Sequence, residues 1–296
     1  MMKVLITGGG GLLGHYLNKV ISESHNILTF YHSKPGNCPR YNSLQVNITD
    51  YKSTDSLIKE FKPDVIIHNA ASASPKKTES ISSKDVFEIN VNATKRIAEF
   101  STAINARIIY TSTDLVYAGY RGSMLKEDDK LIPVSLYAET KLMGEEKIRE
   151  YAGNYLILRT GLLYGFGFEG ASNHFNTMYN DLINKKMVRL FYDQFRTPLS
   201  LPNAARIISL LLNISTGIEV INFGGSERVS RLELGERLCE TAGLDTHLIE
   251  KISMHDLPGI PDVADVSMNT AKLQSFGIKQ KSIYQSLHEI LNENIA

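Results

Sequence analysis

The glycine-rich segment 7–14, TGGGGLLG, constrains the fold most, because of the elements expected on either side of it. The apolar run 3–7, KVLIT, predicts a buried strand before it, and the apolar pattern of 11–21 predicts a helix after it. Glycines at such a junction allow a tight turn and a close approach of the backbone to a pyrophosphate, beside a helix N-terminus that attracts the anion. A flexible glycine turn is the alternative, but this context favours a dinucleotide site. The expected cofactor contacts in the segment are Gly8, Gly11, Leu12, Leu13 and Gly14.

Further along the chain, short apolar runs alternate with helical patterns. Strands are expected over 26–31, 64–71, 107–113 and 154–160, and helices over 53–61, 85–104 and 135–152. Parallel strands need crossover connections, which are usually helices. The pattern therefore predicts an α/β fold with a doubly wound parallel sheet of the Rossmann type.

After Thr160 this alternation loosens. Residues 161–170 are expected to form a loop that leads into a second lobe, followed by helices over 173–186, 201–214 and 231–243 and a strand over 219–225. We predict an NAD(P)-binding Rossmann domain over 1–165 and a smaller, mainly substrate-binding lobe over 166–296, some of whose elements return to the sheet. The crevice between the two is the expected ligand site.

Charge and cysteine content disfavour several classes of partner. Lys+Arg and Asp+Glu both number 32, so no net positive field favours nucleic acid or an anionic membrane. No apolar run approaches the ~20 residues that span a bilayer, and the first residues are too glycine-rich for a signal-peptide core. Cys38 and Cys239 are isolated, lack metal-ligand spacing and suit a reducing compartment. We expect a cytoplasmic protein without a metal site, and leave open whether it forms a homo-oligomer.

The cofactor preference follows from the residues after the second expected strand. An NAD site usually has Asp or Glu about 20 residues past the glycine loop, where it binds the ribose 2′-hydroxyl. Here no acid occurs between Glu23 and Asp50. Ser33 and Lys34 follow the strand and suit a 2′-phosphate, although Lys34 taken alone is equally consistent with a solvated loop lysine. NADP(H) is therefore favoured over NAD(H).

Motifs for chemistry follow the glycine loop in a fixed order. They are Asn69-Ala70-Ala71 after one strand, Ser112-Thr113-Asp114 after another, and Tyr137 four places before Lys141 on a helix. With them the chain resembles the extended short-chain dehydrogenase/reductases, and in particular their dTDP-4-dehydrorhamnose reductase branch. The segments that match this branch in order and spacing are 112–119, 136–145, 158–165, 193–198 and 221–236. The resemblance covers nearly the whole chain.

The resemblance implies that NADPH reduces a 4-keto group on a nucleotide-linked deoxysugar. Tyr137 would protonate the developing alkoxide, Thr113 would hydrogen-bond the same oxygen, and Lys141 would hold the nicotinamide ribose. Tyr137 and Lys141 lie one helical turn apart, so both can reach the crevice. We expect the ammonium and the positive ring of an oxidised cofactor to lower the pKa of Tyr137. Core packing of Tyr137 is the alternative.

Further cofactor contacts are implied by the same resemblance, in addition to Tyr137 and Lys141 themselves. Asn90 matches a helical asparagine that supports the active-site lysine, with an ordinary polar position on the helix surface as the alternative. Asn47 and Ile48 match positions near the adenine. The remaining contacts, at a strand end beside the cofactor, are Ala70, Ala71 and Ser72.

Substrate contacts are implied less directly. Asp114 is expected to touch the sugar, with a helix cap as the alternative. Arg228 and Arg231 suit a diphosphate, although surface arginines are common. The other candidates on the nucleotide-sugar side are Asn173, Asp193, Gln194 and Arg196.

Departures from the family pattern fall on the substrate side. Leu162 replaces an aromatic residue, and Arg196 stands where glycine is frequent. Near the C-terminus, Asp262-Val263-Ala264 stands before the Asp-Val-Ser run, where the family tends to have Arg-Pro. These differences leave the sugar open and allow another 4-keto nucleotide sugar.

A different class of function is the alternative to a reductase. Some proteins of similar sequence are regulatory subunits that bind NADP and another enzyme without turnover. The complete set of Thr113, Tyr137 and Lys141 argues against that role. Epimerase or dehydratase chemistry is a third option and is less favoured, because the dehydratases of the family have an acidic pair straight after the Ser/Thr position, whereas here Leu115 follows Asp114.

Overall fold

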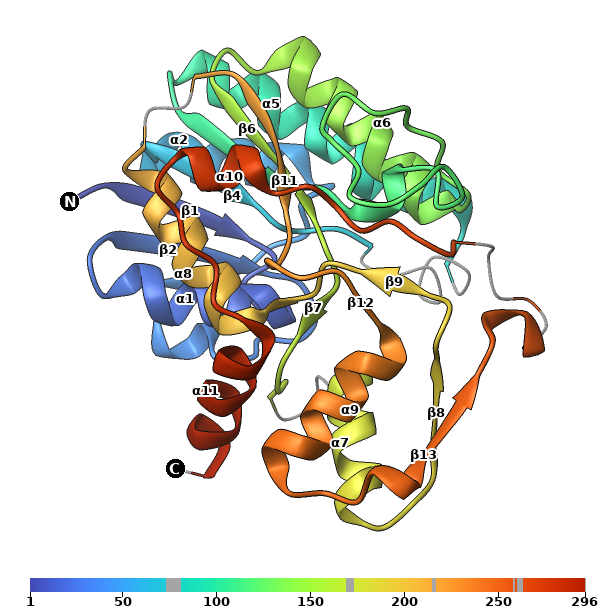
Figure 1. Cartoon of the computed structure of the whole chain (residues 1–296). Coiled ribbons are helices and arrows are strands. Elements are labelled where there is room, and N and C mark those ends of the chain that lie inside the picture. Colours follow the sequence, from blue (N-terminus) through green and yellow to red (C-terminus); the bar gives the residue numbers. More distant parts are fainter. Residues whose placement is uncertain (73–80, 169–172, 215–216, 258, 260–262, 296) are drawn as a thin grey trace.

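The computed structural model of the chain describes residues 1–72, 81–168, 173–214, 217–257, 259 and 263–295. Within these residues a seven-stranded parallel sheet has the order β11-β6-β5-β4-β1-β2-β3 (Figure 1). Its strands are β1 Lys3–Thr7, β2 Asn26–Tyr31, β3 Ser43–Gln45, β4 Val65–His68, β5 Arg107–Thr111, β6 Tyr155–Thr160 and β11 Glu219–Phe223. The chain winds from β1 to one side and then crosses to the other. The predicted doubly wound Rossmann-type sheet is confirmed.

Alternate residues of each strand face opposite layers of helices. Val4 and Ile6 of β1 pack with α1 and α8, whereas Leu5 between them packs with α2, α5 and α6. The helices are α1 Leu12–Ser22, α2 Tyr51–Phe61, α5 Ala93–Ala103, α6 Leu136–Tyr151 and α8 Leu201–Leu212. Because both faces are covered, the strands read as continuous apolar runs rather than as alternating ones.

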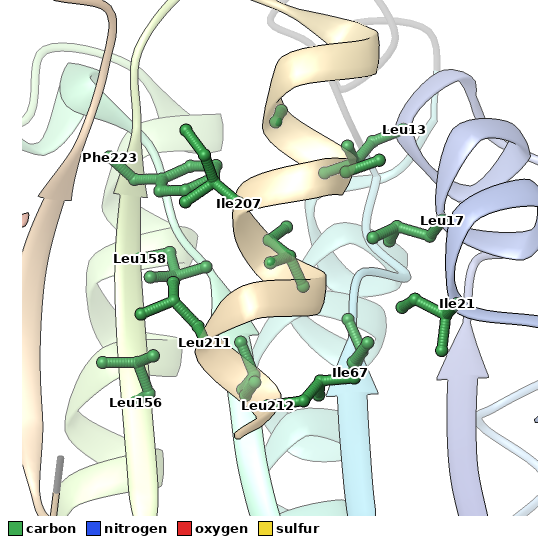
Figure 2. Packing of buried hydrophobic residues seen from close by; sticks show 14 of the residues in the cluster. Leu13, Leu17, Ile21, Ile67, Leu156, Leu158, Ile207, Leu211, Leu212 and Phe223 are labelled. Carbon is green, nitrogen blue, oxygen red and sulfur yellow. The ribbon is translucent and has the colours of Figure 1, made fainter. Parts of the chain in front are cut away.

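Part of the C-terminal half completes this sheet domain. Figure 2 shows α8 between α1 and strand β6, with Leu17 and Leu158 on its two sides. Strand β11 forms the edge of the sheet next to β6. Both elements follow residue 165, where the sequence places the domain boundary. The boundary itself stays a prediction.

The other C-terminal elements surround a second apolar core. These are α7 His174–Ile183, β8 Val188–Phe191, α9 Arg231–Ala242, β13 Ile249–Ile252 and α11 Ile283–Ile295, with β8 and β13 paired in parallel (Figure 1). Short strand pairs join β7 Leu163–Tyr164 to β10 Leu199–Ser200 and β9 Phe195–Arg196 to β12 Val229–Ser230. The remaining short helices are η1 Cys38–Arg40, η3 Asp114–Val116, η4 Thr246–Leu248, η5 Met254–Asp256 and α10 Ala271–Ser275. The prediction of a loop throughout 161–170 is wrong at β7, and residues 169 and 170 lie outside the described part.

Two local features differ from the expected elements. The helix expected over 85–104 consists of α4 Ser83–Phe87, a π-helical turn η2 Glu88–Asn92 and α5. Such turns are frequent at functional sites, and apolar periodicity does not reveal them. Strand β3 is missing from the sequence-based elements because its residues are polar or exposed and show no alternation.

The structure also bears on the cysteines, on membrane-spanning helices and on metal ligands. Cys38 and Cys239 are buried free thiols. Among the described residues, no helix is long and apolar enough to cross a membrane, and no three His, Cys, Asp or Glu side chains are grouped so that they could hold a metal ion.

Candidate active site

The glycine loop forms a tight cradle at the carboxyl end of β1. Gly8 has a φ of +71°, and a Cβ there would lie 2.8 Å from the Ala70 backbone nitrogen at the end of β4. A Cβ on Gly14 would lie 2.7 Å from the Gly9 Cα. No side chain caps the N-terminus of α1, so the N–H groups of its first turn, including those of Leu12 and Leu13, are available to an anion. These residues fit the pyrophosphate of a dinucleotide.

Residues after β2 and β3 lie along the same edge of the sheet. A Cβ on Gly10 would collide with the Lys34 carbonyl oxygen, so the segment with Ser33 and Lys34 packs against the glycine loop. Asn47 accepts a hydrogen bond from the Thr49 nitrogen at 3.1 Å, and Ile48 is buried. The two segments thus follow the neighbouring parallel strands β2 and β3, while their contacts with a cofactor stay predictions.

A buried chain of hydrogen bonds links the glycine loop to the π-helical turn. Thr7 Oγ1 lies 2.8 Å from His68 Nδ1, His68 Nε2 lies 2.9 Å from Thr94 Oγ1, and Thr94 Oγ1 donates to the Asn90 carbonyl at 2.8 Å. Because Thr94 donates to Asn90, it accepts from His68 Nε2–H, and Nδ1 then accepts from Thr7. Burial, with a contribution from Lys141, lowers the pKa of His68 to about 3 and keeps it neutral. The only sequence signal for His68 is a polar residue that ends the apolar run VIIH.

Asn90 joins the end of β4 to α6. Its Oδ1 accepts from the Ser72 nitrogen at 2.8 Å, and its Nδ2 donates to Thr140 Oγ1 at 3.0 Å. Asn90 is 1% exposed, so it is not a solvated residue on the helix surface. Ser72, and Ala70 and Ala71 before it, are thereby held between the glycine loop and the helix that carries Tyr137. Their contacts with a cofactor stay predictions.

The three expected catalytic side chains meet where β5 ends beside α6. The Ser135 hydroxyl caps α6 by accepting from the Ala138 nitrogen at 3.3 Å, which fixes the turn that holds Tyr137. The Tyr137 phenol is hydrogen-bonded to Thr113, whose own hydroxyl donates to Asp114 Oδ1 at 3.3 Å.

Lys141 lies one turn after Tyr137 and is 2% exposed. Its Nζ lies 4.0 Å from the centre of the Tyr110 ring, a cation–π contact. Burial lowers the pKa of Lys141 to about 7, and Glu145 partly opposes this. Burial and the Asp114 carboxylate raise the pKa of Tyr137 to about 12, while the hydrogen bond to Thr113 lowers it.

This pKa of Tyr137 differs from the expected lowering. In the protein by itself, burial and the Asp114 carboxylate dominate the pKa of Tyr137. A phenol that keeps its proton at neutral pH suits a proton donor, which is the role that reduction of a ketone requires.

Asp114, Arg196 and Arg231 form a charge cluster next to Thr113. Asp114 and Arg196 are each 5% exposed, with 3.7 Å between Arg196 Nε and Asp114 Oδ2. Asp114 Oδ2 is buried and accepts no hydrogen bond from the described residues. Arg231 Nε donates to Gln194 Oε1 at 3.2 Å, and burial together with Arg196 lowers the pKa of Arg231 to about 10. Two guanidinium groups and one carboxylate leave this cluster an excess positive charge.

Other residues expected on the substrate side have structural partners. Arg228 pairs with Asp265 at 2.8 Å and stacks over the Phe195 ring. Asn173 caps α7, accepting from the Asn176 nitrogen at 2.9 Å, and its substrate contact stays a prediction. Asp193 accepts hydrogen bonds from Ser253 and from the Met254 nitrogen. Asp262, named among the departures, lies outside the described residues.

The family follows from comparison with known proteins. Residues 2–295 match the family model described as the RmlD substrate binding domain. The chain belongs to this family. The predicted resemblance to the dTDP-4-dehydrorhamnose reductase branch of the extended short-chain dehydrogenase/reductases is thereby confirmed.

Relatives of this RmlD-family chain have names that describe different roles. Spore coat polysaccharide biosynthesis protein SpsK of Bacillus subtilis is 28% identical, with 99% of this chain and 98% of that protein covered. dTDP-4-dehydrorhamnose reductase of Aggregatibacter actinomycetemcomitans is 27% identical, with 98% of both covered. Methionine adenosyltransferase 2 subunit beta of Mus musculus is also 27% identical, with 96% of this chain and 85% of that protein covered.

The RmlD-family fold extends over the whole chain. The solved structure of dTDP-4-dehydrorhamnose reductase from Bacillus anthracis, in complex with NADP, matches it with a TM-score of 0.85. The identity is 22%, and 99% of each chain is covered. At this identity the likeness supports the fold alone.

Proposed function

We propose that the protein is an NADPH-dependent reductase of a 4-keto group on a nucleotide-linked deoxysugar, similar to dTDP-4-dehydrorhamnose reductase. The observation that carries this proposal is the convergence of three side chains: the Tyr137 phenol interacts with the Thr113 hydroxyl, and Lys141 lies buried one turn further along α6. Family membership and the relative named as a reductase support it. The regulatory-subunit alternative is less favoured, because a protein that only binds has no need of these three side chains together.

The glycine cradle and the first turn of α1 would hold the cofactor pyrophosphate. Ser33 and Lys34 would hold a 2′-phosphate, since no acidic side chain occurs between Glu23 and Asp50 to repel it. NADP(H) is therefore preferred, with NAD(H) as the second choice. When bound, the reduced cofactor supplies the hydride that the ketone carbon accepts.

The protein's own groups supply the proton and the orientation. The Tyr137 phenol transfers its proton to the carbonyl oxygen as negative charge develops there. The Thr113 hydroxyl orients the phenol and donates to the same oxygen once the substrate takes the place of Asp114 as its acceptor. Lys141 brings a positive charge to this pocket, which favours both the developing alkoxide and the tyrosinate that remains.

The charge cluster in front of Thr113 would bind the substrate. Asp114 Oδ2 is a buried acceptor without a donor, so a sugar hydroxyl next to the reacting carbonyl would complete it. Arg196 and Arg231 provide the excess positive charge that suits a diphosphate, whereas Arg228 is already paired with Asp265. Binding energy from the nucleotide would position the reacting carbon.

The test combines turnover with ligand binding. NADPH oxidation is measured with dTDP-, UDP-, GDP- and CDP-linked 6-deoxy-4-keto sugars, and with the free sugars as controls. We expect turnover with a nucleotide-linked sugar and far less with the free form. In a melting-temperature screen with NADP⁺ present, the matching nucleoside diphosphate should add about 2.7 kcal/mol of stability at a hundredfold excess over its Kd. No oxidation with any sugar would overturn the reductase proposal. Turnover without a shift from any nucleotide would overturn only the nucleotide part.

A further inference from the structure

Glu145 is a buried carboxylate behind the catalytic residues. It lies one turn after Lys141 on α6 and is 0% exposed. Ser112 Oγ donates to its Oε1 at 2.6 Å, and Arg159 of β6 donates to Oε1 from Nε at 3.1 Å and to Oε2 from Nη2 at 2.9 Å. Arg149 adds a donor to Oε2 at 3.3 Å. Both carboxylate oxygens are therefore occupied, as an ionised group needs when it is buried.

The Glu145 carboxylate connects the two segments that carry the catalytic side chains. Ser112 directly precedes Thr113 at the end of β5, and Glu145 is on the helix that carries Tyr137 and Lys141. The Ser112–Glu145 hydrogen bond spans 33 residues of sequence, so it fixes one segment against the other. Rigid support of this kind sets the geometry of a catalytic group.

Arg159 extends the network to the edge of the sheet. Its Nη1 donates to the Tyr117 hydroxyl at 2.9 Å, and that hydroxyl donates to Asn222 Oδ1 on β11 at 2.6 Å. Asn222 Nδ2 in turn donates to the Leu125 carbonyl at 2.8 Å. A network in which donors and acceptors are matched in this way is rigid, so it fixes the position of the Glu145 carboxylate.

Glu145 is also the carboxylate whose charge acts on Lys141. The other titratable groups that face Lys141 are Tyr137 on the same helix, Tyr110 on β5 and His68 on β4. Both phenols and the imidazole are neutral at pH 7, because burial raises the pKa of each phenol and lowers that of His68. The negative charge near the ammonium, among the described groups, therefore comes from Glu145.

We propose that Glu145 is a positioning residue for the reaction: through Ser112 it holds Thr113 against Tyr137, and its charge stabilises the ammonium form of Lys141. The proposal rests on the reductase function for its kinetic part. Its electrostatic part concerns the protein alone and is testable without a substrate.

Ser112→Ala tests the link to Thr113 while leaving the Glu145–Arg159 pair in place. We expect kcat to fall about tenfold with KM nearly unchanged, because a slightly displaced Thr113 weakens only the reacting geometry. The control is Ser101→Ala, which removes another buried serine whose hydroxyl donates to the Ala98 carbonyl on α5, and kcat should not change. Equal kcat values for Ser112→Ala and wild type would overturn the positioning role.

Glu145→Gln tests the charge. The pKa of Lys141 is followed by ¹³C NMR of labelled lysine side chains in the cofactor-free protein, with Lys141→Arg to assign the signal. Loss of the carboxylate should lower this pKa by about one unit, and the alkaline limb of the pH profile of kcat/KM should move with it. An unshifted lysine in a folded variant would overturn the electrostatic role.

A further variant covers the case in which Glu145→Gln does not fold. Glu145→Gln/Arg159→Met removes both charges of the buried pair, and by the same titration it should also lower the pKa of Lys141. If wild type reduced no keto sugar, the proposed function would fail while the NMR titration still decided the electrostatic part.

Discussion

Two charge clusters flank Thr113, and they differ in whether their polar atoms have partners. Behind it, both oxygens of Glu145 accept hydrogen bonds from Ser112 and Arg159. In front of it, Asp114 leaves one buried oxygen without a donor and lies 3.7 Å from Arg196. A buried network in which every polar atom has a hydrogen-bond partner is rigid. A buried acceptor without a donor needs an explanation, and a bound ligand that supplies the donor is one.

The contrast begins from adjacent residues of one short segment. Ser112 donates its hydroxyl to the rear cluster, which consists of Glu145 and Arg159. Asp114 belongs to the front cluster with Arg196 and Arg231, and Thr113 lies between the two in sequence. Chemistry thus takes place at the border between a rigid scaffold and a site for the substrate. Substitutions on the two sides should therefore change different quantities.

The largest expected difference is in stability. Glu145→Gln leaves Arg159 buried without its counter-charge and should lower the free energy of unfolding by about 3–5 kcal/mol. Asp114→Asn disturbs a looser ion pair and should cost about 1 kcal/mol. Urea unfolding of both variants measures this. Equal losses would show that the front cluster is as much a part of the scaffold as the rear one.

Tyr137 stands at the border and should affect chemistry alone. Tyr137→Phe removes the proton donor but keeps the ring, so kcat should fall about a hundredfold or more. Thr113→Val should cost less, because it removes one hydrogen bond. NADPH oxidation gives kcat, and equilibrium titration should show unchanged NADP⁺ binding. Near-wild-type turnover of Tyr137→Phe would end its catalytic assignment.

Sequence reasoning reached the glycine loop and Tyr137 with Lys141 because each motif is local. A loop of consecutive residues and a pair one helical turn apart are visible as patterns. The Glu145 cluster could not be predicted, because Arg159 and Ser112 lie 14 and 33 residues from Glu145 and no sequence pattern links residues at such separations. The π-helical turn that holds Asn90 was missed for a related reason, since it lies inside an ordinary helical pattern.

Asp114→Asn should act on the substrate more than on the fold. A hydrogen bond to a charged group contributes about 1.5–3 kcal/mol, so kcat/KM should fall about 10- to 150-fold. Asp50→Asn, at the exposed N-cap of α2, is the matched control and should leave kcat/KM unchanged. The loss should vanish with a substrate analogue that lacks the hydroxyl next to the ketone. A loss independent of that hydroxyl would contradict the role of Asp114 as its acceptor.

Lys141 should make stability depend on pH. Its pKa is lowered from 10.5 to about 7 in the folded protein, so above pH 7 the unfolded chain binds a proton that the folded protein has released. Stability should therefore rise with pH, by at most about 1.4 kcal/mol per unit. Urea unfolding of cofactor-free protein between pH 7 and 8.5 measures the slope, which should be smaller in Lys141→Met. Identical slopes in wild type and Lys141→Met would mean that Lys141 stays charged in the folded protein over this pH range.

The smallest effect is expected at an exposed cation far from both clusters. Lys34 packs by its backbone against Gly10, and its ammonium is proposed to bind the 2′-phosphate, which NADH lacks. Lys34→Ala should therefore weaken NADPH binding by about fivefold or less and leave NADH binding unchanged, because a solvent-exposed charge pair contributes about 1 kcal/mol or less. Fluorescence titration of both cofactors measures it, with Lys52→Ala on α2 as the control. Increasing salt should reduce the difference, since exposed charges are screened. Equal losses for both cofactors would show that Lys34 supports the glycine loop rather than recognising the phosphate. Lys34 would then belong to the structural scaffold, as the Glu145 cluster does, and not to a ligand site.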